Sequence, residues 1–182
     1  MNALLDLQKK LFLLAKGTDL VLHQKDIFTL LSLTDSSAAR MMLQRAVAAG
    51  IIRNPVRSIY LFTPGGSVQP GSIFKLARRL RNGHFNYLSL ESVLAQAGLI
   101  AQLPLDRITI MTSGRSQVFE LAGIGVIEFT HTQKNMDSLA PNLVWDDAIG
   151  MFRATPEYAR RDLKRVGRNW DMVEGEDKHD QT

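Results

Sequence analysis

The sequence predicts a mixed α+β protein of two domains, and three observations support this prediction. Apolar residues recur at helical spacing through the first fifty positions, and two short β-type segments follow them. A stretch rich in Gly, Pro and Ser then interrupts the pattern. Beyond it, helices and three extended segments predict a small α/β domain with an antiparallel sheet. We therefore expect domains at 1–64 and 73–170, a linker at 65–72 and a flexible acidic tail at 171–182.

The composition excludes several classes of protein. Of the 182 residues, 45% are hydrophobic and 22% are charged, which excludes a wholly disordered chain, a collagen and a polytopic membrane protein. The sequence has no cysteine, so disulfides, thiolate zinc sites and iron–sulfur clusters are excluded. The apolar run at 11–15 is too short for a signal peptide or a membrane span. We expect a cytoplasmic protein with no membrane partner.

The charge is divided unevenly along the chain. Residues 1–82 carry 12 Lys and Arg against 4 Asp and Glu, whereas residues 83–182 carry 10 against 14. A basic half joined to an acidic half indicates that one part meets a polyanion and the other does not. Small soluble proteins also vary this much by chance, so the charge alone leaves nucleic-acid binding open.

The elements of residues 1–64 follow the order of a winged helix-turn-helix. The first helix is capped by Asn2 and ended by Gly17, and an extended segment at 18–22 follows it. A second helix at 24–31 leads to a turn in which Thr34 or Asp35 caps a third helix at 36–49. Two strands at 51–53 and 58–62, joined by a turn at 54–57, complete the unit. Other small α+β modules share this order. The basic residues favour the winged helix, because they lie where that fold contacts DNA.

In a winged helix-turn-helix the second helix of the motif, here 36–49, enters the major groove. Arg suits guanine and Gln suits adenine, because each presents two groups in one plane, so Arg40 and Gln44 are expected to read bases. Ser36 and Ser37 begin the helix, where backbone N–H groups favour a phosphate. The bland alternative is a solvated helix face. Four residues at core spacing are expected to face inward: Ala39, Leu43, Ala46 and Val47.

Further basic residues lie outside this helix. Arg53, Asn54 and Arg57 cluster at the predicted hairpin turn and are expected to contact the DNA backbone or the minor groove, unless they only make the turn soluble. A helix expected at 72–81 carries four cations that either extend the phosphate-binding face or solvate an amphipathic helix. These cations are Lys75, Arg78, Arg79 and Arg81.

The second half predicts two further helices and a three-stranded antiparallel sheet. The elements are a helix at 89–97, strands at 108–112, 117–121 and 126–130, and a helix that begins at Thr155-Pro156-Glu157. The last helix carries five cations that could bind nucleic acid or an acidic protein, although a solvated face is the simpler interpretation. They are Arg160, Arg161, Lys164, Arg165 and Arg168.

Nothing in the sequence has the pattern of a catalytic, metal or cofactor site. The four histidines (23, 84, 131 and 179) lack metal-ligand spacing, and neither a phosphate-binding Gly-rich motif nor a nucleophile elbow occurs. The turn at 113–116 could hold an anion, but a turn between two strands needs such residues anyway. We therefore expect no enzyme activity, no cofactor and no metal.

The order of several motifs in the second half resembles the AbiEi family of antitoxins and regulators of type IV toxin–antitoxin systems. The matching segments are Tyr87-Leu88-Ser89-Leu90, Ala97-Gly98-Leu99-Ile100, the strand 108–112 with its small-basic turn Ser113-Gly114-Arg115, the strand 125–132 with His131, and Ala154-Thr155-Pro156-Glu157 with Asp162 six residues after Pro156. Together these segments span residues 85–168, and a winged helix-turn-helix in front of them is the family's usual arrangement.

The resemblance implies an N-terminal domain that represses its own operon and a C-terminal domain needed for antitoxicity. The partner toxin would be nucleotidyltransferase-like, and a stable complex with it is not required. By position, the family's basic recognition helix and wing match Arg40, Arg45, Arg53 and Arg57. The complete set of expected DNA-binding residues is Ser36, Ser37, Arg40, Gln44, Arg45, Arg53, Asn54, Arg57, Lys75, Arg78 and Arg79.

The sequence predicts a repressor that occludes its own promoter, and the expected partner is double-stranded operator DNA with inverted repeats. One alternative is a stand-alone regulator without a toxin. Another is a protein-interaction module that binds an acidic partner, and a third is an enzyme that acts on the toxin or on nucleotides. Either a monomer or a dimer fits a single recognition helix.

Overall fold

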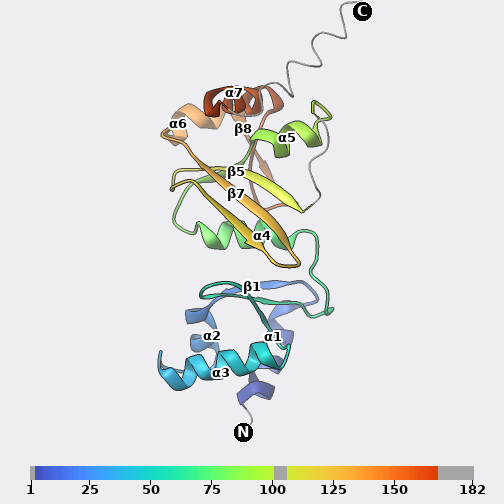
Figure 1. Cartoon of the computed structure of the whole chain (residues 1–182), viewed down its shortest axis with the longest axis vertical. Coiled ribbons are helices and arrows are strands. Elements are labelled where there is room, and N and C mark those ends of the chain that lie inside the picture. Colours follow the sequence, from blue (N-terminus) through green and yellow to red (C-terminus); the bar gives the residue numbers. More distant parts are fainter. Residues whose placement is uncertain (1–2, 101–105, 168–182) are drawn as a thin grey trace, which may run out of the picture. The chain divides into compact units, whose positions relative to one another are not determined.

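The computed structural model describes residues 3–100 and 106–167 and shows a mixed α+β protein with two β-sheets. The chain divides into two compact units, Met1–Leu80 and Arg81–Thr182, and each is considered by itself (Figure 1). Over the described ranges, no helix combines the length and the apolar character that crossing a membrane requires. The expected cap Asn2, the cation Arg168 and the acidic tail lie outside the described residues.

Unit 1 contains the helices and strands that the sequence predicts for its first 64 residues, in the same order. They are α1 (Ala3–Ala15), β1 (Leu20–His23), α2 (Gln24–Leu30), α3 (Ser37–Ala48), β2 (Arg53–Val56) and β3 (Ile59–Phe62), followed by α4 (Ser72–Leu80). The three strands form an antiparallel sheet in the order β1-β3-β2. Because β3 is the central strand, its side chains are buried along its whole length.

The core of unit 1 forms where the three helices and the sheet turn their apolar faces toward one another. Leu7 and Leu11 of α1, Ile27 of α2 and Leu43 of α3 are at most 1% exposed and belong to one cluster. Their spacing on α1 and α3 follows the helical repeat, which explains why the sequence pattern locates these helices well. The ring of Phe12 adds an edge-on contact to Phe62 at 5.0 Å between centroids.

The predicted linker is tied to the segment before β1 rather than loose. Asp19 is 1% exposed, and its Oδ2 accepts hydrogen bonds from the Ser72 hydroxyl at 2.6 Å and from the Gln69 backbone N–H at 2.8 Å. The Gln69 side chain also donates to the Gly17 carbonyl. These bonds join the segment before β1 to the start of α4, and the structure groups α4 with unit 1, whereas the sequence places the second domain from residue 73 onward.

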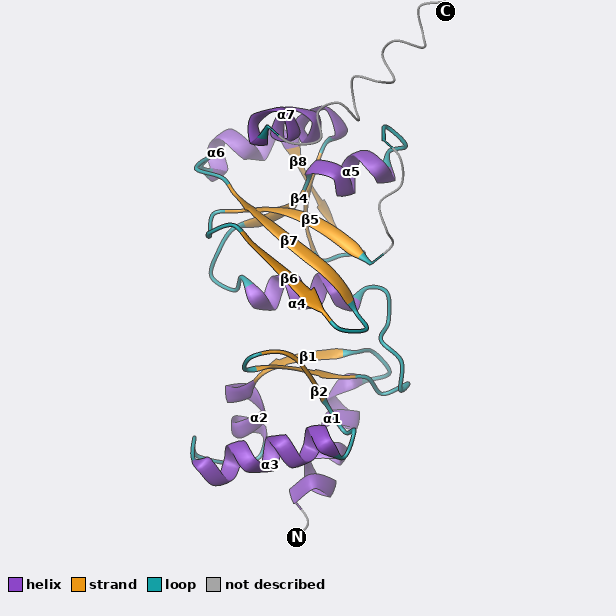
Figure 2. Cartoon of the chain, viewed as in Figure 1, coloured by secondary structure: helices purple, strands orange, loops and turns teal. Residues whose placement is uncertain are grey.

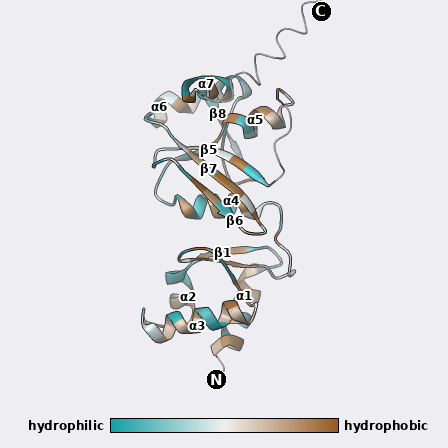
Figure 3. Cartoon of the chain, in the orientation of Figure 1, coloured by the Kyte–Doolittle hydropathy of each residue, from teal (hydrophilic) through white to brown (hydrophobic). Residues whose placement is uncertain are grey.

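Unit 2 is built on a six-stranded sheet with strand order β6-β7-β5-β4-β9-β8 (Figure 2). Its strands are β4 (Asn86–Leu88), β5 (Arg107–Thr112), β6 (Gln117–Leu121), β7 (Gly125–His131), β8 (Leu143–Asp146) and β9 (Met151–Ala154). Its helices are α5 (Leu90–Gln96), α6 (Met136–Leu139), the short 3-10 helix η1 (Ala140–Asn142) and α7 (Pro156–Val166). Apolar residues concentrate in β7, whereas α7 is mostly hydrophilic (Figure 3).

The prediction of an antiparallel sheet in this unit is wrong, because the sheet is mixed. β5 pairs parallel to β7, and β4 pairs parallel to β9, while the other pairs are antiparallel. The β5 segment is buried on nearly every residue, and a strand buried on both faces fits the centre of a sheet. It therefore takes β7 as one neighbour and β4 as the other, and the turn at 113–116 leads to β6 at the sheet edge without forming a hairpin.

The start of the last helix is confirmed in detail. Thr155 is the N-cap of α7, and its side-chain oxygen accepts the Tyr158 backbone N–H at 3.3 Å. Pro156 occupies the first helical turn, and Gly167 ends the helix in a left-handed conformation with φ of +69°. This is the pairing of Pro at the start and Gly past the end that favours a defined helix.

Candidate nucleic-acid interface

Helix α3 presents one polar face to solvent, which we call the α3 face and define as Ser37, Arg40, Met41 and Gln44. All four residues are exposed. On the opposite side Ala39, Leu43 and Ala46 are buried, as their spacing predicts, and Val47 is half-buried. Arg40 and Gln44 lie one helical turn apart, so their side chains share a side of the helix. Arg45 is also exposed.

The prediction that Thr34 or Asp35 caps α3 is wrong, because Ser36 is the N-cap. Its hydroxyl accepts the Ala39 backbone N–H at 3.2 Å, which satisfies one of the free amides of the first turn. Asp35 instead pairs with Arg40, with 2.9 Å between Oδ1 and Nε. The hydrogen bond and the charge of this carboxylate raise the pKa of Arg40 above its ordinary value. Arg40 is therefore held close to the start of its own helix.

The hairpin residues lie differently from the prediction. The segment 54–56 belongs to strand β2, and the turn comes at 57–58. Asn54 is a structural residue, since its amide donates to the carbonyls of Val56 at 2.8 Å and Ile59 at 2.7 Å. Its side chain closes the hairpin where the β2–β3 register shifts. Arg53 and Arg57 are exposed and remain candidates for a phosphate contact.

Two of the cations predicted on α4 have partners within unit 1. The ammonium of Lys75 donates to the Asp19 carbonyl at 2.9 Å. Arg79 forms an ion pair with Asp26, whose carboxylate also accepts the His23 backbone N–H at the start of α2. Arg78 is exposed. These contacts hold α4 against the rest of the unit and make Lys75 and Arg79 weaker candidates for DNA contact than the α3 face.

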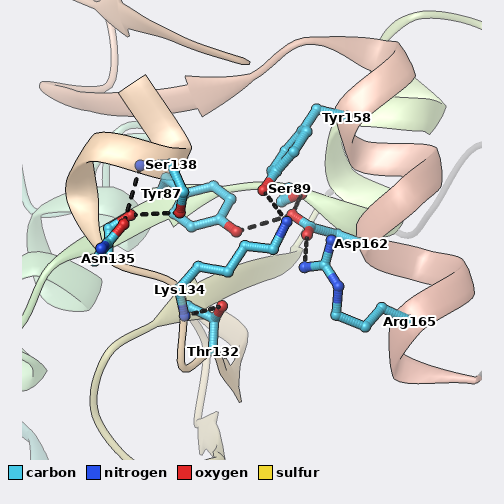
Figure 4. A network of polar contacts seen from close by, with 9 residues as sticks. All are labelled: Tyr87, Ser89, Thr132, Lys134, Asn135, Ser138, Tyr158, Asp162 and Arg165. Carbon is cyan, nitrogen blue, oxygen red and sulfur yellow. Dashed lines mark hydrogen bonds and ion pairs between the residues drawn. The ribbon is translucent and has the colours of Figure 1, made fainter. Parts of the chain in front are cut away.

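Unit 2 contains a buried polar network centred on one carboxylate (Figure 4). Asp162 of α7 is fully buried, and its Oδ2 accepts hydrogen bonds from the Tyr87 hydroxyl at 2.9 Å and the Ser89 hydroxyl at 2.8 Å. Its Oδ1 accepts from the Arg165 guanidinium at 2.8 Å. Each of the three donors is thus aimed at a charge that would be costly to bury without them. The network joins β4 and the start of α5 to α7.

Two neighbouring sets of hydrogen bonds extend this polar core. The Lys134 ammonium donates to the Tyr158 hydroxyl at 2.8 Å, which anchors the segment after β7 to α7 (Figure 4). The hydroxyl of Thr109 donates to the Ser89 carbonyl at 2.8 Å and accepts the Ser92 backbone N–H at 3.0 Å. Sequence periodicity does not reveal any of these pairs, since their partners are far apart in the chain.

The arrangement serves packing better than catalysis. The Asp162 carboxylate has no exposed surface, so a substrate would reach it only after α7 moved. Across the ranges that the structure describes, no group of three or more His, Asp or Glu side chains is placed to hold a metal ion. The full burial of the Asp162 carboxylate and its three hydrogen bonds support a structural role for the network.

Replacing Tyr87 by Phe is expected to make unit 2 less sensitive to alkaline pH. Burial, and then the adjacent Asp162 carboxylate, raise the pKa of the Tyr87 phenol above its ordinary value of 10.0. An unfolded chain loses this proton above about pH 10 while the folded protein keeps it, so stability falls as pH rises, by up to about 1.4 kcal/mol per pH unit.

At neutral pH the Tyr87→Phe protein should be less stable by about 1.5–3 kcal/mol, because a hydrogen bond to a buried charge is lost. Urea unfolding followed at several pH values between neutral and strongly alkaline measures both effects. Equal slopes of stability against alkaline pH in the two proteins would contradict the assignment. Tyr60, whose pKa burial also raises, is present in both proteins and cancels in the comparison.

These features define a two-unit α+β protein with a basic first unit and an exposed polar helix face. No family model matches the chain, and no curated protein matches it. Among solved structures, the RV2827C protein from Mycobacterium tuberculosis is similar, with a TM-score of 0.61 and 17% sequence identity. The match covers 90% of this chain and 60% of that chain, so this chain spans 60% of its neighbour's length. At this identity the likeness concerns the fold alone.

Proposed function

We propose that unit 1 is a winged helix-turn-helix that binds operator DNA, and that the protein acts in the cytoplasm as a transcriptional repressor. The observation that carries the proposal is the α3 face, where Arg40 and Gln44 stand exposed one helical turn apart while the opposite side of α3 is buried. In this fold α3 is the recognition helix, and β2 and β3 form the wing. Promoter occlusion follows if the bound site overlaps the operon's own start.

The charges of unit 1 support the same proposal. Unit 1, residues 1–80, carries 11 Lys and Arg against 4 Asp and Glu, an excess of seven, and exposed Arg45, Arg53 and Arg57 lie on α3 and the hairpin. Phosphate contacts of this kind supply affinity and orientation without reading sequence. The planar side chains of Arg40 and Gln44 are suited to reading base edges in the major groove. In this proposal the exposed arginines Arg45, Arg53 and Arg57 supply affinity, and Arg40 and Gln44 supply sequence specificity.

We further propose that unit 2 belongs to an antitoxin of the AbiEi type that counteracts a nucleotidyltransferase-like toxin. Motif residues that are far apart in the sequence support this assignment, because the hydroxyls of Tyr87 and Ser89 both donate to the buried carboxylate of Asp162. A shared polar core is a reason for such residues to recur together in a family. In this proposal unit 2 needs its fold for antitoxicity and has no catalytic role.

An electrophoretic mobility shift on the DNA upstream of the gene tests the repressor proposal. The experiment uses several salt concentrations, labelled upstream DNA and a scrambled competitor of equal length. We expect a specific shift that weakens steeply with salt, because each phosphate contact adds about 0.9 to the log–log slope. Equal binding to both DNAs would leave only a basic surface and would favour a protein-interaction module. Co-purification with the product of the neighbouring gene then becomes the next test.

Replacing Asp35 by Asn is expected to tighten operator binding several-fold. The carboxylate now holds Arg40 by an ion pair in which both side chains are exposed, 60% for Arg40 and 47% for Asp35. Its removal frees the guanidinium and also removes a negative charge next to the proposed DNA surface. Titration of labelled operator at two salt concentrations measures the change. Asp6→Asn, which breaks the Asp6–Lys10 pair on α1, is the matched control and should leave affinity unchanged. A weaker or unaltered Asp35→Asn complex would show that the pair does not restrain Arg40.

A further inference from the structure

Four strand ends of the unit 2 sheet meet beside the turn Ser113–Ser116. The parallel strands β5 and β7 end there at Thr112 and His131, which are partners in the register. The antiparallel neighbours β4 and β6 begin at the same edge, opposite Thr112 and Phe129. The turn is therefore supported from both sides by regular structure.

Hydrogen bonds fix the shape of this turn. Ser113 and Phe85 exchange two bonds, since the Ser113 N–H donates to the Phe85 carbonyl and the Ser113 hydroxyl accepts the Phe85 N–H. The Ser116 hydroxyl accepts the His131 backbone N–H at 2.9 Å. A Cβ atom at Gly114 would lie 3.2 Å from the His84 ring, so the ring packs directly on the turn backbone. A pre-shaped turn binds a ligand without first paying to become ordered.

Two cationic side chains, Arg81 and Arg115, lie beside the turn with the rings of His84 and His131, and we call these four residues the turn cluster. Arg81 lies over the Phe129 ring at 4.8 Å and donates only to neutral acceptors, the Arg115 carbonyl at 3.2 Å and the Gln117 side chain at 3.0 Å. Neither guanidinium has an ion-pair partner in the part of the chain that the structure describes. Burial of Arg81, and after it the positive charge of Arg115, lower the pKa of Arg81.

The acidic side chains of this sheet lie away from the turn cluster. Glu128 pairs with Arg107 of β5 at 3.1 Å. Asp106 and Glu120 line a hollow at the β6–β7 turn, which is the opposite end of the strands from Thr112 and His131. The positive charge at the turn is thus not neutralised by a nearby carboxylate of unit 2 within the described ranges.

The turn also offers hydrogen-bond donors that face no protein acceptor. Because the Ser113 and Ser116 hydroxyls each accept a backbone N–H, their own protons remain available, and no described residue accepts them. The exposed Arg115 guanidinium supplies further donors in a planar fork. Hydroxyl and guanidinium donors around an uncompensated positive charge match a tetrahedral oxyanion, whose several oxygens each accept hydrogen bonds.

We propose that the turn Ser113–Ser116, with Arg81 and Arg115, is a phosphate-binding site. The ligand is a phosphate group, carried either by a small molecule such as a nucleotide or by the backbone of a nucleic acid. This site belongs to unit 2 and does not depend on the proposed operator binding by α3.

Amide resonances of the full chain, followed by NMR during titration with inorganic phosphate, test the proposal. We expect saturable shifts at 113–116 and at His131, and none with chloride at equal ionic strength. Arg115→Gln should weaken the binding about tenfold, because one charge-assisted contact is lost. Arg161→Gln, which removes an exposed charge from α7, should leave it unchanged. Similar weakening by both variants would show general charge attraction and overturn the site.

Parallel titrations with a nucleoside monophosphate and with a short duplex identify the source of the phosphate. Shifts with the free phosphates assign a small ligand, and shifts with the duplex alone assign a nucleic-acid backbone. Both results support the site, provided that Arg115→Gln abolishes or weakens them. The absence of shifts with every probe overturns the proposal. If Arg115→Gln disturbs the fold, Arg115→Lys keeps the charge but loses the planar fork and should weaken binding by a smaller factor.

Discussion

Replacing Asp162 by Ala is expected to destabilise unit 2 by about 2–6 kcal/mol, because two buried hydroxyls lose their acceptor at about 1–3 kcal/mol each. The carboxylate is fully buried and accepts from Tyr87, Ser89 and Arg165. Its loss leaves the two buried hydroxyls without their acceptor and opens a small void between α7 and the sheet. Such a loss is a large share of the stability of an ordinary domain.

Native-state hydrogen exchange at the slowest amides of β4 and β5 measures this effect separately from unit 1. Asp162→Asn keeps the size of the side chain and one acceptor oxygen, so it should cost less than the Ala variant and should remain folded. Asp137→Ala removes an exposed carboxylate from α6 and should change stability by no more than about 0.5 kcal/mol. A loss for Asp162→Ala no larger than for Asp137→Ala would mean that the network is not what holds α7.

The same variants separate the two proposed functions. Operator binding by unit 1 should survive Asp162→Ala under conditions where unit 1 is folded, because no part of the α3 face lies in unit 2. Protection against the toxin should fall, since the proposal assigns it to unit 2. Loss of both activities with unit 1 still folded would indicate that operator binding also requires unit 2.

Local patterns predict the helices of this protein well. The apolar repeat of α1 and α3 and the Thr155-Pro156 start of α7 depend on neighbours within one or two turns, and the structure has all three where the sequence places them. The helix caps are less certain from sequence. The sequence predicts Thr34 or Asp35 as the cap of α3, whereas in the structure Ser36 caps the helix and Asp35 pairs with Arg40.

Strand pairing could not be predicted, because it depends on partners far apart in the chain. The sequence identifies the β5, β6 and β7 segments but joins β5 to β6, whereas β7 lies between them. Strands β4, β8 and β9 have three or four residues each, too few for alternation to stand out. In the β5 segment Thr109 interrupts the apolar residues Ile108, Ile110 and Met111, so the sequence resembles an alternating strand and does not reveal a central strand buried on both faces.

In the candidate nucleic-acid interface, too, features that depend on neighbouring residues could be predicted, whereas contacts between residues far apart in the chain could not. Exposure of Arg40 and Gln44 follows from helical periodicity, so the sequence alone predicts the α3 face. The partners of Lys75 and Arg79 are about fifty residues away in the chain, at Asp19 and Asp26, so sequence alone counts both cations as available for DNA. A buried acid such as Asp19 is not distinguishable in sequence from an exposed one.

Replacing Arg40 by Ala is expected to weaken operator binding about tenfold or more and to relax the preference at one base-pair position. In the proposed complex the Arg40 guanidinium makes two hydrogen bonds to a guanine edge, and such a pair distinguishes the right base from the wrong ones. The ion pair with Asp35 must open for this contact, and because both groups are exposed the loss of affinity is no larger than the several-fold gain expected for Asp35→Asn. Gln44→Ala should relax a neighbouring position, where an adenine is expected.

A variant of the wing serves as the comparison for Arg40→Ala, because it should change affinity without changing sequence preference. Arg57 is exposed on the β2–β3 turn, so Arg57→Ala should weaken all DNA sequences alike and lower the log–log salt slope by about 0.9. Lys9→Ala removes an exposed charge from α1, outside the proposed surface, and should change neither affinity nor specificity. Binding of each variant to a randomised operator library, read by sequencing the bound fraction, separates lost affinity from lost specificity. A footprint unchanged in strength and sequence for Arg40→Ala would show that α3 is not the recognition helix, because no other exposed residue on its face presents a guanidinium.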